Sequence, residues 1–269
     1  MQDDADRIDY TETGDGPTVV LVPGSCSTGS AWKPVISAWG PDLRFVTTSL
    51  PGYGGTRERR SETDTSIAHV AGAVEAVIRK AGGPVHLVGH SFGGLAALAV
   101  ALRGSVPLAS LAIMEPPAVG VLACYNDTPE LDLFGQMLSD YKRDFTNGRR
   151  DAIANMMDFF AGAGTFASWP ERVRGYAMET TPANFLDWGS AHGFALTWDE
   201  LARIDMPTLL LCGGVSHPAM QRIVARLGET IPRAETNVID GAAHFMITTH
   251  AAEVAARLRR HVSRAMETT

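Results

Sequence analysis

The chain has 269 residues and a formal net charge of −7, with 45% hydrophobic and 20% charged residues. This composition is typical of a globular protein whose apolar side chains can fill a large core. The acidic balance argues against a nucleic-acid partner, because a phosphate backbone requires a face of Lys and Arg.

Short apolar runs alternate with helical patterns along most of the chain. Residues 8–12 alternate and precede a Gly/Pro turn, and strands are predicted at 18–22, 44–48, 85–88, 108–114, 207–212 and 235–239. Helices are predicted at 32–39, 65–80, 91–102, 219–227 and 250–262. Because most strands are continuously apolar, this order predicts an α/β fold: a mostly parallel sheet with helices on both faces.

Residues 118–203 interrupt the alternation. They contain no convincing strand but show four helical patterns, at 131–145, 149–160, 170–178 and 183–191. We therefore expect a helical cap inserted over the edge of the sheet. It divides the core into a first part, residues 1–117, and a second part, residues 204–269.

A nucleophile motif lies between the strand at 85–88 and the helix that follows it. Residues 89–94 read Gly-His-Ser-Phe-Gly-Gly. A sharp turn from strand to helix exposes its central residue, here Ser91, and needs flanking glycines where any Cβ would clash. The start of the helix adds free N–H groups beneath the reacting centre. The motif predicts a serine nucleophile.

A serine nucleophile needs a base, and the base needs an acid that orients it. His244 follows the last predicted strand, so it is expected at the same edge of the sheet as Ser91. The other histidines fall in helices, in a strand, or in loops and at helix edges, and His90, beside the nucleophile, is expected to point elsewhere. His244 is therefore the predicted base.

With these motifs in this order, the sequence resembles cap-bearing serine hydrolases of the α/β-hydrolase fold, over nearly the whole chain. The family usually places the acid three residues after a Gly that follows the penultimate strand, but that position is Ser216 here. A minority, including haloalkane dehalogenases and zearalenone-type lactonases, carries it after the strand that follows the nucleophile helix. Glu115 stands there, which makes it the predicted acid, with Asp240 as the alternative.

An oxyanion hole formed by two backbone N–H groups is expected beside Ser91. Phe92 would supply the first and Ser25, in the loop after the first central strand, the second. Cys26 is the alternative, and the Ser25 hydroxyl could add a further donor.

The predicted cap is rich in aromatic and Met side chains, which favours an apolar pocket above Ser91. The candidate pocket residues are Gly24, Cys26, Tyr53, Phe160, Trp188 and His192. The expected activity is hydrolysis of a neutral, moderately hydrophobic carboxylic ester or lactone through an acyl-enzyme. The alternatives are hydrolysis of a carbon–carbon bond in a β-diketone-like substrate and a non-catalytic ligand receptor.

No apolar stretch is long enough to cross a bilayer, and residues 1–6 are acidic and lack the apolar core of a signal peptide. The three cysteines have no metal-ligand spacing and cannot all pair within one chain. We therefore expect a cytoplasmic monomer or homodimer that acts on a small molecule, with no metal, no cofactor and no membrane partner.

Overall fold

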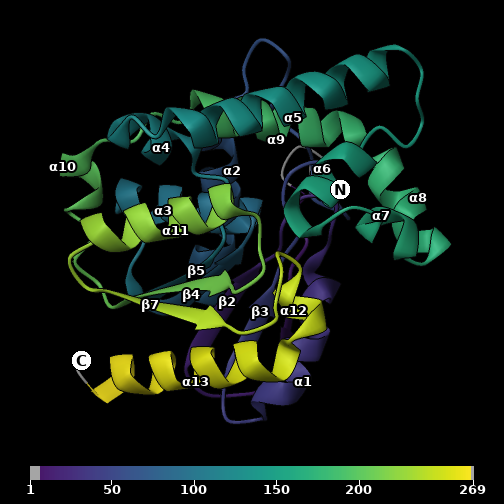
Figure 1. The fold of residues 1–269 in the computed structure, drawn as a ribbon. Helices are drawn as coiled ribbons and strands as arrows, with labels where there is room; N and C mark the ends of the chain where they lie inside the picture. The colour runs from purple at the N-terminus through teal and green to yellow at the C-terminus, as the bar shows by residue number, and fades with distance from the viewer. Residues whose placement is uncertain (1–6, 268–269) are drawn as a thin grey trace.

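The computed structural model describes residues 7–267, and within them seven strands form one sheet at the centre of the molecule (Figure 1). The order across the sheet is β1-β3-β2-β4-β5-β6-β7; β1 is antiparallel to β3, and all other neighbours are parallel. The strands are β1 (Thr11–Thr13), β2 (Thr18–Val22), β3 (Arg44–Thr47), β4 (Val85–His90), β5 (Leu108–Met114), β6 (Thr208–Gly213) and β7 (Ala234–Ile239).

Helices cover both faces of this sheet (Figure 1). One face carries η2 (Gly29–Trp32), α1 (Lys33–Trp39), α12 (Met246–Thr249) and α13 (Ala251–Glu267), and the other carries α2 (Ile67–Ala81), α3 (Phe92–Arg103) and α11 (Pro218–Thr230). Val20 and Val22 of β2 enter one hydrophobic core, whereas Val19 and Leu21 enter the other. Because successive strand side chains point to opposite faces, a strand buried on both sides must be apolar throughout. The predicted doubly covered sheet is confirmed.

Seven further helices lie between β5 and β6 among the described residues, and we call them the inserted helices. Helices α4 and α5 pack on α11, and α9 contacts α2 and α3. Asp127, between α4 and α5, accepts two hydrogen bonds from Arg226 of α11, at 2.7 and 2.9 Å. The inserted helices are α4 (Val119–Tyr125), α5 (Thr128–Thr146), α6 (Ala154–Ala161), α7 (Thr165–Ser168), α8 (Glu171–Glu179), α9 (Thr181–Gly193) and α10 (Trp198–Leu201).

Most predicted elements have counterparts within a few residues. The strand predicted at 108–114 coincides with β5, and the helix predicted at 91–102 begins one residue later, at Phe92. Helices α4, α7, α10 and α12 were not predicted, since each spans seven residues or fewer and two turns of helix carry little periodicity.

In residues 7–267, no helix has both the length and the apolar character needed to cross a membrane. Residues 1–6, where the sequence shows no signal-peptide core, lie outside the described part of the chain, as do residues 268 and 269.

Candidate active site

The predicted site residues meet at the carboxyl edge of the sheet, where neighbouring parallel strands end. Ser91 directly follows β4, Glu115 directly follows β5, and His244 lies in the loop after β7. Strands β4, β5, β6 and β7 are consecutive neighbours, so their carboxyl ends lie side by side. Loops at this edge are where open α/β sheets place their ligand sites.

Ser91 occupies a strained turn between β4 and α3. Its φ is 54° and its ψ is −128°, a backbone conformation that residues other than glycine rarely adopt. The turn is tight because glycines let the backbone approach closely. A Cβ on Gly89 would lie 2.3 Å from the Gly93 carbonyl oxygen, and a Cβ on Gly93 would lie 2.3 Å from the Pro23 carbonyl oxygen. The strained turn leaves the Ser91 hydroxyl facing the cavity described below.

A continuous chain of hydrogen bonds joins Ser91, His244 and Glu115. The His244 Nε2 atom lies 2.9 Å from the Ser91 hydroxyl oxygen, and the Nδ1 atom lies 2.7 Å from Glu115 Oε2. A carboxylate only accepts hydrogen bonds, so Nδ1 carries the proton and Nε2 accepts from the Ser91 hydroxyl. In this arrangement Nε2 is free to take the hydroxyl proton.

Glu115 is completely buried, and its second carboxylate oxygen is also occupied. Oε1 accepts the Gly213 N–H at 2.7 Å and a weaker contact from the Cys212 thiol at 3.5 Å. Burial by itself raises the pKa of Glu115, but His244, the Gly213 N–H and the Ser216 hydroxyl together lower it overall. The carboxyl group is therefore an anion at neutral pH.

Two other positions considered for the acid have different surroundings. Asp240 is exposed on the loop that follows β7. Ser216, at the position where the family usually carries the acid, is buried close to Gly213. The carboxylate that contacts His244 is that of Glu115, at the end of β5, the strand beside β6.

His90 braces the loop that carries His244. Its Nε2 atom donates to the His244 backbone carbonyl at 2.7 Å. Burial, together with the nearby His244 charge, lowers the pKa of His90 to about 3, so the ring is neutral at physiological pH. Sequence reasoning set His90 aside as a neighbour of the nucleophile that points elsewhere. The contact joins residues 154 positions apart, so no local pattern signals it.

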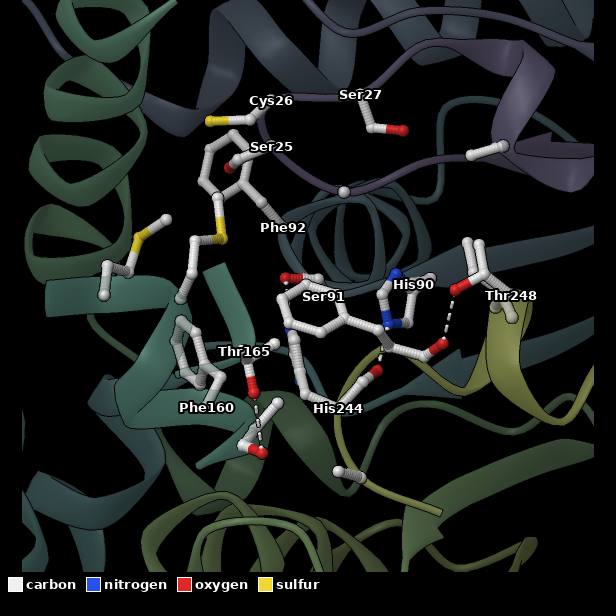
Figure 2. A pocket seen from close by; sticks show the side chains of 18 of the residues that line it. Ser25, Cys26, Ser27, His90, Ser91, Phe92, Phe160, Thr165, His244 and Thr248 are labelled. Carbon is white, nitrogen blue, oxygen red and sulfur yellow. Dashed lines mark hydrogen bonds between the residues drawn. The ribbon is translucent and has the colours of Figure 1, made fainter. Parts of the chain in front are cut away.

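A cavity of about 630 Å³ opens above Ser91 (Figure 2). Its floor includes Ser91 and His244, and the loop of Ser25 and Cys26 runs along one side. The Phe160 ring, from α6, stacks on the His244 imidazole with 4.5 Å between ring centres and 19° between planes. The inserted helices contribute much of the remaining wall, including Met156, Met157, Thr165, Val173, Asn184 and Trp188.

A sequence model of the alpha/beta hydrolase family matches residues 19–257. The chain belongs to this family. Its curated relatives agree with that assignment and support hydrolase activity.

The pimeloyl-[acyl-carrier protein] methyl ester esterase of Xanthomonas campestris pv. campestris is 28% identical over 262 residues, which cover 93% of this chain and 96% of the relative. A 2-hydroxy-6-oxononadienedioate/2-hydroxy-6-oxononatrienedioate hydrolase of Burkholderia vietnamiensis is 23% identical over an alignment that covers 91% of this chain and 87% of the relative. The solved structure of a thermophilic esterase from Thermogutta terrifontis superposes with a TM-score of 0.75 at 21% identity, over 96% of this chain and 93% of that one. The structural likeness concerns the alpha/beta hydrolase fold.

Four of the six candidate pocket residues line the cavity of this alpha/beta hydrolase: Gly24, Cys26, Phe160 and Trp188. The other two, Tyr53 and His192, are not among the residues that line it. The Tyr53 side chain is buried behind the cavity, where its hydroxyl donates to Asp187 at 2.6 Å. His192 lies on the exposed side of α9.

The two predicted oxyanion residues both line the cavity beside the nucleophile. Phe92 is the first residue of α3, so its N–H is among those that a helix start leaves without an intrahelical partner. Ser25 lines the cavity from the loop after β2. The Ser25 hydroxyl does not serve as a further donor to the cavity, because it donates to Asp187 Oδ2 at 2.5 Å.

Sequence reasoning missed Asp187 and Arg60, which form a buried ion pair beside this loop, with 2.8 Å between Arg60 Nη2 and Asp187 Oδ1. Asp187 lies between Leu186 and Trp188 in a helical pattern dominated by apolar residues. A carboxylate in such a setting is the one signal that points to a buried partner. The sequence does not say which cation pairs with it.

Proposed function

We propose that this protein is a serine hydrolase that cleaves a neutral, moderately hydrophobic carboxylic ester or lactone through an acyl-enzyme. The observation that carries the proposal is the hydrogen-bonded chain from Ser91 through His244 to the buried Glu115, which opens into a largely apolar cavity. The curated relatives named as methyl ester esterases support an ester as the substrate.

The reaction proceeds in two halves. The Ser91 oxygen attacks the substrate carbonyl while His244 Nε2 takes the hydroxyl proton, and the N–H groups of Phe92 and Ser25 stabilise the oxyanion. The tetrahedral intermediate then collapses, the carbon–oxygen bond to the alcohol breaks, and His244 protonates that alcohol. Water repeats the attack on the acyl-enzyme and releases the acid. Glu115 holds His244 in the required tautomer and stabilises its positive charge.

The cavity lining favours an uncharged, partly apolar substrate. No Lys or Arg side chain of the described residues lines it, and its one carboxylate, Asp187, is paired with Arg60. Aromatic and Met side chains from the inserted helices form much of the wall. At about 630 Å³ the cavity is in the range typical of small-molecule sites, about 300–1,000 Å³.

Hydrolysis of a carbon–carbon bond beside a ketone is the second candidate, favoured by the relative named as a 2-hydroxy-6-oxononadienedioate/2-hydroxy-6-oxononatrienedioate hydrolase. The same Ser91, His244 and oxyanion donors serve such a reaction. A receptor without catalytic activity is disfavoured, because the chain of hydrogen bonds that activates Ser91 is intact.

The test is a panel of p-nitrophenyl esters of increasing acyl length, an aliphatic lactone, an aromatic lactone and a β-diketone, with the Ser91→Ala variant as the blank. We expect ester or lactone turnover that disappears in the blank, and covalent labelling of Ser91 by a fluorophosphonate. Turnover of the β-diketone alone would favour carbon–carbon cleavage. A wild-type protein that is neither active nor labelled would refute the hydrolase proposal.

A further inference from the structure

Asp187, on the inserted helix α9, gathers hydrogen bonds from two distant loops of the core. It is 2% exposed, and its Oδ2 atom accepts the Ser25 hydroxyl at 2.5 Å and the Tyr53 hydroxyl at 2.6 Å. Its Oδ1 atom faces Arg60 Nη2 at 2.8 Å. Both carboxylate oxygens of Asp187 therefore have partners within the protein.

Arg60 is equally well held. Its side chain is fully buried, and it contacts Glu58 at 2.7 Å and the Ser190 hydroxyl at 3.1 Å in addition to Asp187. Burial acts to lower the pKa of Arg60, but the Asp187 and Glu58 carboxylates raise it overall, so the guanidinium remains charged. The guanidinium carbon lies 5.6 Å from the centre of the Phe92 ring, within the range of a cation–π contact.

This ion pair thus touches both residues assigned to the oxyanion hole. Asp187 accepts a hydrogen bond from the Ser25 hydroxyl, and Arg60 lies over the ring of Phe92. The loop that follows Ser25 is strained, since Cys26 has a φ of 56°. A residue other than glycine keeps such a backbone only where the surroundings impose it. The Ser25–Asp187 hydrogen bond is a contact that can impose it.

We propose that the Arg60–Asp187 pair positions the Ser25 and Phe92 N–H groups for oxyanion stabilisation, and so makes the inserted helix α9 part of the catalytic arrangement. The inference rests on the proposed function. In this view Arg60 and Asp187 are positioning residues: they act through Ser25 and Phe92 and not on the reacting atoms. Their effect should therefore appear in the transition state, with little change in the binding of the substrate ground state.

The first variant is Ser25→Ala, which removes the hydroxyl but keeps the backbone N–H. We expect kcat to fall by about tenfold to a hundredfold, a fraction of what the loss of an oxyanion donor costs, with KM changed by less than about threefold. Tyr53→Phe is the matched comparison. It removes a hydroxyl donated to the same Asp187 oxygen, but Tyr53 supplies no oxyanion N–H, so its kcat should fall by less than that of Ser25→Ala.

The second variant replaces the whole ion pair, as Arg60→Met with Asp187→Leu. Removing Arg60 alone would leave the buried Asp187 carboxylate without its cation and endanger folding, whereas apolar replacement of a buried pair is often tolerated. We expect the kcat of this double variant to fall by about as much as the kcat of Ser25→Ala. Adding Ser25→Ala to it should cost little more, because the hydroxyl has already lost its acceptor.

Binding of a boronic acid separates a positioning role from a merely structural one. The boronate forms a tetrahedral adduct with Ser91 and fills the oxyanion hole, so its affinity should fall in parallel with kcat/KM while the affinity for the product acid is retained.

Three results would overturn the inference alone, provided that the wild-type protein is an active esterase labelled at Ser91. They are a Ser25→Ala variant that keeps wild-type kcat, a loss in Tyr53→Phe equal to that in Ser25→Ala, and full additivity of Ser25→Ala with the double replacement. A wild-type protein that is neither active nor labelled would instead overturn the proposed function, and this inference with it.

Discussion

Replacing Glu115 by glutamine changes one oxygen to an amide at the most buried point of the site. In the wild type the two carboxylate oxygens accept two donors, the His244 Nδ1–H at 2.7 Å and the Gly213 N–H at 2.7 Å. Glutamine has one acceptor oxygen. In either orientation its NH₂ group therefore faces a donor, because the backbone N–H cannot be reversed and His244 can adapt only by adopting the wrong tautomer.

The size of the effect follows from the charge that is lost. During the reaction His244 becomes positive beside the Glu115 anion. Two unit charges about 4 Å apart interact by about 4 kcal/mol at an effective dielectric constant of about 20, which corresponds to about a thousandfold in rate. The tautomer conflict adds to this, so we expect kcat to fall by about 10³–10⁴-fold, as when a triad acid becomes its amide.

Steady-state hydrolysis of a p-nitrophenyl ester measures this loss, with Ser91→Ala defining the background. Asp240→Asn is the matched control: it makes the same chemical change at the exposed carboxylate four residues before His244, and it should retain kcat. A Glu115→Gln variant that turns over at near the wild-type rate would refute the assignment. A large loss in Asp240→Asn instead would return the role of the acid to that residue.

Three further predictions test the strained turn at Ser91, the stability of the fold at low pH and the lining of the pocket. Gly93→Ala should abolish soluble, active protein, because its Cβ would lie 2.3 Å from a backbone carbonyl oxygen; the soluble yield measures this. Gly72→Ala, with open space around it in α2, should instead raise the free energy of unfolding by about 0.5–1 kcal/mol, measured by urea denaturation. Burial, and to a lesser extent the charge of His86, lowers the pKa of His261 to about 4 from its usual 6.5, so between these pH values only the unfolded chain is protonated at this site and stability falls as the pH drops. His261→Gln should reduce that fall by about 1.4 kcal/mol per pH unit, and an unchanged slope of unfolding free energy against pH would contradict the reasoning. Phe160→Leu should shift the best p-nitrophenyl ester towards a longer acyl chain, because the Phe160 ring forms part of the cavity wall; an unaltered chain-length profile would show that the acyl group lies elsewhere.

The sequence alone was sufficient to predict the fold and the residues of the hydrogen-bonded chain. Ser91 could be recognised because its requirements are local: a buried strand, a tight turn with glycines and a small-residue helix all lie within one short segment. His244 and Glu115 could be assigned by their positions after strands, since parallel strands bring their carboxyl ends to one edge. The cap aromatics predicted an apolar pocket, and Phe160 and Trp188, which were named for it, line the cavity.

Only the tertiary structure decided which hydrogen-bond partners the polar groups near Ser91, His244 and Glu115 have. Ser25 and Asp187 are 162 positions apart, and Tyr53 and Asp187 are 134 apart, yet all three meet in one buried network. The Tyr53 and Ser25 hydroxyls therefore donate hydrogen bonds to Asp187, although each was expected to face the substrate. The physical reason is that a buried carboxylate must find donors wherever the packed chain offers them, and sequence spacing does not encode which donors those are.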